Sequence, residues 1–267
     1  MDVLNALQSE LAASTGRLLS TVAGLSDADL AEPSRLPGWT RGHLITHVAR
    51  NADSLVNLVD WARTGVETPQ YPSVAARDAD IAAGASRPVK EQLADLEESS
   101  ARLAAAFRDM PAAAWSAMVS GMQPPPHPAW YLLVRRVRET EIHHVDLGAG
   151  YDCSDWPEPF VRRELHDAMV SWSRELSTVS EIVVEEVKDG DKHRQVWRDL
   201  GSGPVVQGDA RTLLAWVTGR SAGAGLRVMR EGDTGNRPAA GPLPSPPPWS
   251  ALPTASSLPA TPPEEYP

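Results

Sequence analysis

Residues 138–148 read RETEIHHVDLG, and the interpretation of the whole chain can start from them. The stretch is typical of the last turns of a helix, because a glycine closes it and another follows two residues later. On a helix, residues three or four apart share a face. Glu139 therefore pairs with His143, and Glu141 pairs with His144. Either pair could supply two ligands to a metal ion, and a stable site needs at least a third from elsewhere.

A stretch far upstream offers the third ligand. Residues 37–51 read PGWTRGHLITHVARN, which predicts a turn followed by a helix that Thr40 can cap. Apolar residues then recur at helical spacing and indicate a buried stripe. His47 lies at the edge of that stripe, whereas His43 lies one turn earlier, near the exposed start of the helix.

Two inward histidines and one carboxylate on separate helices would form a metal site in the core of a helical bundle. Neutral imidazoles with one carboxylate suit zinc and leave a fourth position open for chemistry. The alternative is that His47 is a hydrogen-bonded core histidine and Glu139 a solvated surface charge, because helical E-x-x-x-H pairs often arise by chance. Spacing leaves both interpretations open.

Several short segments carry a family resemblance. They are GWTR (residues 38–41), HLI (43–45), HVA (47–49), NA (51–52), WA (61–62), TG (64–65), ETP (67–69), RE (138–139), IH (142–143), VDLGA (145–149) and GR (219–220). In these segments the sequence resembles the mycothiol-dependent maleylpyruvate isomerases, members of the DinB-like metal-binding superfamily. The resemblance covers most of residues 1–231 and is most specific from residue 38 to residue 86.

The resemblance implies which residues bind the metal. In that family a helical bundle holds zinc through two histidines and one glutamate, which fall here on His47, Glu139 and His143. The resemblance also implies that Arg220, in a small second domain, serves activity. Spacing alone would make Arg220 a cation favoured at a helix C-terminus by the helix dipole.

The implied activity is the cis–trans isomerisation of maleylpyruvate to fumarylpyruvate, a step of gentisate-type aromatic degradation, with zinc and mycothiol as cofactors. Two other functions fit the same residues. A mycothiol S-transferase would need the same thiolate. A non-enzymatic zinc-binding regulatory module would close the site with a fourth protein ligand, for which His43 and His144 are candidates.

The composition limits the classes of partner. A net charge of −10 argues against nucleic-acid binding, and no apolar run approaches the roughly 20 residues that span a membrane. The sequence opens without a signal peptide pattern and has one cysteine, so we expect a cytoplasmic protein without disulfides. That cysteine, Cys153, has acidic neighbours that disfavour its thiolate. The resemblance implies maleylpyruvate and an external low-molecular-weight thiol as the small-molecule partners, and we expect a monomer.

Apolar periodicity predicts an α+β protein whose first domain is a four-helix bundle over residues 1–150, and the resemblance implies that this bundle is DinB-like. Its helices are expected near residues 2–23, 40–64, 88–109 and 128–147, with a loop at 111–127. A long connection at residues 65–87 should carry a short helix. Tyr71 and Arg77 lie on this connection and are interpreted as surface packing.

A small α/β domain is expected over residues 155–231. We predict helices at 159–177 and 209–219, and short strands at 181–187, 195–197, 204–208 and 226–228. Residues 232–267 hold eleven of the 24 prolines. They are predicted to form a disordered tail, because such a composition buries too little apolar surface to offset its ordering entropy.

Overall fold

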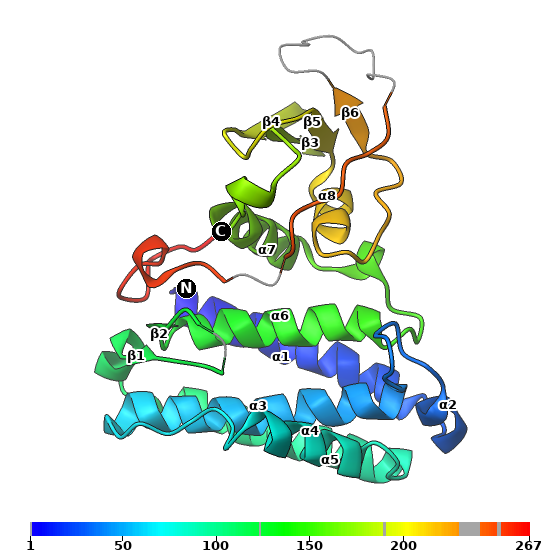
Figure 1. Cartoon of the computed structure of the whole chain (residues 1–267). Coiled ribbons are helices and arrows are strands. Elements are labelled where there is room, and N and C mark those ends of the chain that lie inside the picture. The colour runs from blue at the N-terminus through cyan, green and yellow to red at the C-terminus, as the bar shows by residue number, and fades with distance from the viewer. Residues whose placement is uncertain (1, 123, 189–190, 230–240, 250–251) are drawn as a thin grey trace. The chain divides into compact units, whose positions relative to one another are not determined.

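The computed structural model describes the chain except for residues 1, 123, 189–190, 230–240 and 250–251. Its internal contacts divide the chain into two compact units. Unit 1 comprises Met1–Asp152 and Thr254–Tyr266, and unit 2 comprises Cys153–Pro253 with Pro267. Figure 1 labels the elements of both. No helix in the described part of the chain combines the length and apolar character that crossing a membrane requires.

Unit 1 is built on four long helices. They are α1 (Val3–Ala23), α3 (Arg41–Thr64), α5 (Val89–Arg108) and α6 (Tyr131–Asp146). Helices α1 and α3 each pack against both α5 and α6, as Figure 1 illustrates. The short helices α2 (Asp27–Ala31) and α4 (Val74–Gly84) lie in the connections. The predicted bundle with a long crossover is confirmed.

The start of α3 is tied to the end of α6. Thr40 caps α3, because its hydroxyl accepts from the backbone N–H of His43 at 3.4 Å. The next residue, Arg41, donates to the carbonyl oxygens of Leu147 at 3.0 Å and Gly148 at 2.9 Å. A cation is favourable at this negative end of α6. The GWTR segment therefore fixes two helices relative to each other, and these two helices carry the predicted metal ligands.

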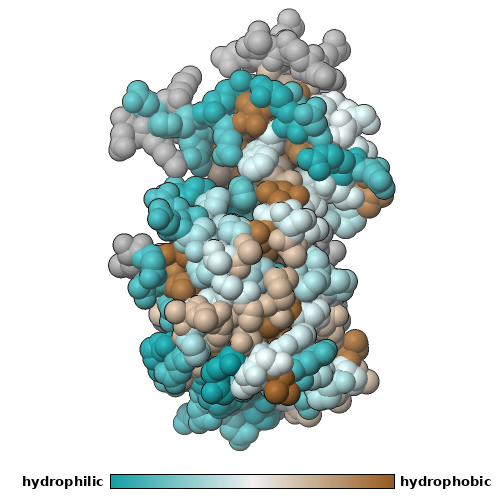
Figure 2. Space-filling model, turned by 90° about the vertical axis from the view of Figure 1, so that its left-hand side faces the viewer, coloured by the Kyte–Doolittle hydropathy of each residue, from teal (hydrophilic) through white to brown (hydrophobic). Residues whose placement is uncertain are grey.

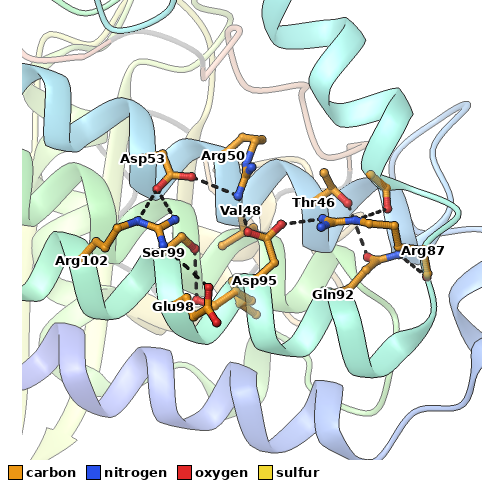
Figure 3. A network of polar contacts seen from close by, with 12 residues as sticks. Thr46, Val48, Arg50, Asp53, Arg87, Gln92, Asp95, Glu98, Ser99 and Arg102 are labelled. Carbon is orange, nitrogen blue, oxygen red and sulfur yellow. Dashed lines mark hydrogen bonds and ion pairs between the residues drawn. The ribbon is translucent and has the colours of Figure 1, made fainter.

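Helices α3 and α5 are joined by a polar network along their shared edge (Figure 3). Arg50 and Arg87 both bind Asp95, and Arg102 binds Asp53 at 2.7 Å. Individual exposed ion pairs contribute little, but a network fixes the register of the two helices.

At the start of α3, Gly42 lets the crossover approach closely. A Cβ atom at this position would lie 2.1 Å from the carbonyl oxygen of Ala85. That distance is far below van der Waals contact, so the close packing of the crossover against α3 requires glycine here.

Apolar side chains from the helices of unit 1 form its core. One cluster comprises Leu18, Val22, Leu30, Leu44, Ile45, Val48, Ala49, Leu96 and Leu147. Figure 2 shows one face of the molecule, on which apolar residues are scattered among hydrophilic ones. Among the described residues, the exposed large apolar side chains are Val66, Val74, Met118, Met122 and Leu176. Most of the apolar residues that recur at helical spacing are therefore buried in the core rather than exposed at the surface.

The segment between α5 and α6 is more regular than the predicted loop. It contains a 3₁₀ helix (Ala112–Ser116) and a two-stranded antiparallel ladder of β1 (Met118–Val119) and β2 (His127–Pro128). The loop prediction was wrong here because strands of two residues are too short to produce a detectable alternation of apolar residues.

Unit 2 contains a four-stranded sheet in the order β4-β3-β5-β6. The strands are β3 (Glu181–Lys188), β4 (Asp191–Trp197), β5 (Val205–Gly208) and β6 (Arg227–Met229). Strands β3 and β5 are parallel, and the other two pairs are antiparallel. The helices are α7 (Glu158–Val170) and α8 (Ala210–Val217), which Asp209 caps. The α+β fold class is confirmed.

Helix α7 ends at Val170, seven residues before the predicted end. The chain then turns so that the buried indole of Trp172 donates to the carbonyl oxygen of Leu200 at 3.0 Å. A short 3₁₀ helix (Arg174–Leu176) follows. Trp172, whose apolar side chain led us to predict a longer helix, is therefore buried from an irregular segment.

The predicted tail lies partly outside the described residues, and its described part makes specific contacts. Residues 254–266 belong to unit 1. The carbonyl oxygen of Pro259 accepts from the indole N–H of Trp130 at 2.9 Å, and the ring of Tyr266 lies 5.0 Å from that of Trp130. This segment differs from the predicted disorder because a few apolar and aromatic side chains pack on a helix that is already ordered.

Candidate metal centre

Three potential metal ligands meet between α3 and α6. His47 comes from α3, and Glu139 and His143 come from α6; one ligand atom of each lies within 4.8 Å of the others. Oε2 of Glu139 is 3.3 Å from Nε2 of His47 and 3.4 Å from Nε2 of His143. We call these residues the His–Glu–His group. The structure therefore brings together the three residues that the family resemblance implied.

The orientation of His143 is set by Asp146, one turn later on α6. The Nδ1 atom of His143 lies 3.0 Å from Oδ2 of Asp146, whose carboxylate can only accept. Nδ1 therefore carries a proton, and Nε2 is the ring nitrogen that faces Glu139. Asp146 is only 2% exposed. A buried carboxylate that binds the outer nitrogen of a histidine is the usual support of a histidine ligand.

The crossover also reaches this group. Nη2 of Arg77, on α4, lies 3.3 Å from Nδ1 of His47, and the Arg77 guanidinium lies 5.9 Å from the Trp39 ring. The Trp39 ring in turn meets the imidazole of His47 edge-on at 5.4 Å. Arg77 was interpreted as surface packing. The only signal for its role was its place on a long crossover, where functional contacts concentrate.

The charges of the group depend on burial and on the short distances within it. Burial raises the pKa of the Glu139 carboxyl, but the two imidazoles outweigh it and hold that pKa well below its usual value. Burial lowers the pKa of His47. Burial also lowers the pKa of His143, yet Asp146 and Glu139 together raise it to about 9. Without a metal, the group is therefore an ionised carboxylate beside one neutral and one protonated imidazole.

The donor atoms fit a zinc ion. Within the described part of the chain, Oε2 of Glu139 is buried and has no hydrogen-bond partner. A buried carboxylate oxygen without a partner is costly, and a cation bound between it and the two imidazole nitrogens would remove that cost. Two imidazoles and one carboxylate are also a known ligand set of catalytic zinc. The residues present therefore fit the metal that the resemblance implied.

Glu141 and His144, the other pair that spacing allowed, lie on the side of α6 that faces α1. Arg17 of α1 and the hydroxyl of Tyr151 both donate to the carboxylate of Glu141. Nε2 of His144 lies 2.8 Å from the hydroxyl of Thr21, and its ring stacks on Tyr151 at 3.7 Å. These two residues therefore join helices rather than contribute to the His–Glu–His group.

His43 also has another role. Its Nδ1 accepts from the backbone N–H of Thr40 at 3.3 Å and completes the capping box of α3. Among the described residues, no fourth histidine, cysteine, aspartate or glutamate joins the His–Glu–His group. Cys153 lies in unit 2.

Arg220 belongs to unit 2 and follows α8. Gly219 adopts a φ of +73°, a left-handed conformation that ends the helix. The backbone N–H of Arg220 donates to Ala215 O at 2.8 Å, and its Nη1 donates to Thr218 O at 2.6 Å. Its guanidinium also lies 5.3 Å from the ring of Trp249. Arg220 thus sits at a helix C-terminus, with one face of its guanidinium against an aromatic ring.

Comparisons with known proteins agree on one family. Residues 11–148 match the model of the mycothiol maleylpyruvate isomerase N-terminal domain. The crystal structure of a mycothiol-dependent maleylpyruvate isomerase is similar at 31% sequence identity with a TM-score of 0.77, covering 92% of this chain and 97% of that one. The structure of a mutant of such an enzyme is similar at 31% identity, with the same coverage and a TM-score of 0.76.

A comparison with curated proteins gives no match. The family model covers half of the chain, and the solved relative is similar over nearly all of it. The chain belongs to the mycothiol maleylpyruvate isomerase family.

Proposed function

We propose that this protein isomerises maleylpyruvate to fumarylpyruvate, with zinc and mycothiol as cofactors. The proposal rests on the His–Glu–His group, in which a buried carboxylate oxygen lies 3.3 and 3.4 Å from two imidazole nitrogens and has no hydrogen-bond partner among the described residues. The activity named for the solved relatives supports the choice of substrate and thiol.

The reaction needs a thiolate. Addition of a thiolate to the cis double bond turns that bond into a single bond, which rotates freely. Elimination of the thiolate then leaves the trans product, so no thiol is consumed. When bound, zinc would favour the deprotonated form of a thiol at its open position.

This chain supplies the frame for that chemistry. Glu139 remains ionised in a buried position, Asp146 holds the ring of His143, and Trp39 packs against His47. His43 and His144 are engaged with Thr40 and Thr21. That arrangement supports an open coordination position over a zinc site closed by four protein ligands, and hence an enzyme over a regulatory module.

We propose that Arg220 binds a carboxylate or the developing enolate oxygen of the substrate. An arginine can grip a carboxylate through two parallel hydrogen bonds, and the substrate is a dicarboxylate in an acidic protein.

The test is an ultraviolet absorbance assay of maleylpyruvate with purified zinc-loaded protein. We expect isomerisation with mycothiol, no turnover without it, and no loss of thiol during the reaction. Consumption of mycothiol would indicate an S-transferase instead. Cys153→Ser should keep full activity, because the nucleophile is external; an inactive Cys153→Ser enzyme would contradict the proposal.

Arg220 is tested in the same assay. Arg220→Ala should lose most of the activity, and Arg220→Lys should keep part of it because the charge remains without the planar fork. Both variants should contain normal zinc, since Arg220 is not a ligand. A near-normal Arg220→Ala enzyme would limit this residue to ending a helix.

A further inference from the structure

Unit 1 has a groove between α1 and α5, apart from the His–Glu–His group. Its volume is about 700 Å³, within the range of roughly 300–1,000 Å³ typical of small-molecule sites. None of the residues of the His–Glu–His group lines it. Most of its wall is apolar and comprises Leu11, Ala12, Leu19, Leu103, Ala104 and Phe107.

Arg136 of α6 also lines this groove. The residue is only 1% exposed. Its Nη1 donates to the carbonyl oxygen of Val48 at 2.9 Å and to Oδ1 of Asn51 at 2.8 Å, both on α3. Across the described residues, Arg136 forms no ion pair, and the hydrogen bonds of its side chain are both made by Nη1. The guanidinium thus offers donors to whatever enters the groove.

No carboxylate of the described residues forms an ion pair with Arg136, although the charges of Glu139 and Asp53 act on it from a distance. Burial lowers the pKa of its guanidinium to about 10, so the group is still charged at neutral pH. Burying a charge without a counter-charge is costly. The hydroxyl of Ser100 also lines the groove. It is buried without a hydrogen-bond partner in the described chain, which is costly as well.

We propose that this groove binds an amphipathic monocarboxylate, such as a medium-chain fatty acid. Its carboxylate would accept hydrogen bonds from Arg136, and its alkyl chain would lie along the apolar walls from α1 and α5. Among the described residues that line the groove, Arg136 is the buried cation and favours one anionic head group, whereas Glu97 and Arg108 are exposed charges of opposite sign. This site goes beyond the proposed isomerase, whose substrate carries two carboxylates.

The test compares sodium decanoate with 1-decanol, its neutral analogue, by calorimetric titration of the zinc-loaded protein below the micelle concentration. We expect decanoate to bind at least about tenfold more tightly, because hydrogen bonds to a charged group are the stronger ones. Equal affinities would overturn the role of Arg136. In Arg136→Met the two affinities should become similar.

A second variant blocks the groove without touching the charge. Gly16 on α1 lines the groove, and a Cβ atom there would meet nothing within 4 Å. Gly16→Leu should therefore fill the groove, favour the helix and abolish binding of both probes. The matched control is Ala13→Leu, at an exposed position of the same helix outside the lining, which should bind like the wild type. Unchanged binding in Gly16→Leu would overturn the proposal, even if Arg136→Met failed to fold.

Discussion

Single residues of α6 differ in function according to the helix that they face. Glu139 and His143 face His47 of α3, whereas Glu141 and His144 face α1. We expect His47→Ala, Glu139→Ala and His143→Ala each to lose zinc, because a site reduced from three ligands to two binds metal weakly. Metal analysis of the purified variants is the measurement.

The matched controls are Glu141→Gln and His144→Gln. Both should keep one zinc per chain, although each should lower the free energy of unfolding by about 1–3 kcal/mol through a disturbed buried hydrogen bond. Zinc loss in these controls, with retention in the alanine variants of the other face, would mean that the metal binds on the α1 side.

Asp146 should tune the metal without binding it. Asp146→Asn removes the negative charge that His143 Nδ1 faces at 3.0 Å. Loss of such a partner typically weakens metal binding by roughly 10–100-fold. Competition with a chromophoric chelator would measure the affinity. Asp60→Asn, at a partly exposed acid of α3 that pairs with Arg63, is the control. An unchanged affinity in Asp146→Asn would reduce that residue to a structural role.

Some of this site could be predicted from residues and some could not. The i, i+4 spacing of Glu139 and His143 predicted a shared face, and the structure has it. Spacing could not choose between that pair and Glu141 with His144, because the choice depends on Arg17, 124 residues away from Glu141. Spacing could not predict the contact of Arg77 with His47 either, because this contact depends on how the connection between α3 and α5 folds back over α3.

At the scale of elements, the β1–β2 ladder should make stability depend on pH. His127 of β2 is buried; its Nδ1 lies 3.3 Å from Pro128 O, and its Nε2 lies 2.8 Å from Nη1 of Arg135. Burial, and then the charge of Arg135, lower the pKa of His127 to about 3. The folded chain therefore keeps this imidazole neutral at a pH where the unfolded chain protonates it.

The direction of the pH effect on stability follows from this difference in the pKa of His127 between the folded and the unfolded chain. Because the folded pKa lies below the ordinary histidine value of 6.5, the unfolded state binds more protons between about pH 6.5 and pH 3. The free energy of unfolding should fall as the pH falls through this range, by about 2 kcal/mol between pH 7 and pH 5. Urea titrations of the wild type and His127→Gln would test it. The variant keeps an acceptor for Arg135 but cannot titrate, so an equal loss in both would contradict the assignment.

Elements with long apolar periodicity were the ones that the sequence predicted well. Helices α1, α3, α5 and α6 begin and end within a few residues of expectation, because each buries a continuous stripe. The β1–β2 ladder was missed because it has no stripe. Trp172 misled the prediction of α7, since an apolar residue packs equally well from an irregular segment.

At the scale of the whole molecule, unit 1 depends on a segment that follows unit 2. Leu258, in that segment, is only 6% exposed. Leu258→Ala should lower the free energy of unfolding of unit 1 by roughly 2 kcal/mol or more, as buried leucines do. Glu264→Ala, an exposed position of the same segment, should change it by less than about 0.5 kcal/mol. Chemical unfolding of both variants is the measurement, and equal effects would indicate that the segment adds nothing.

The discontinuous composition of unit 1 has a consequence for synthesis on the ribosome. The indole of Trp130 and the carbonyl that it binds are 129 residues apart in the chain. At roughly 5–20 residues per second, the nascent bundle waits about 6–26 s for its last segment to be translated. During that interval the ring of Trp130 lacks its final cover, and unit 2 is made in full. During translation there is therefore an interval in which the bundle, still without residues 254–266, exposes an aromatic surface that chaperones can recognise.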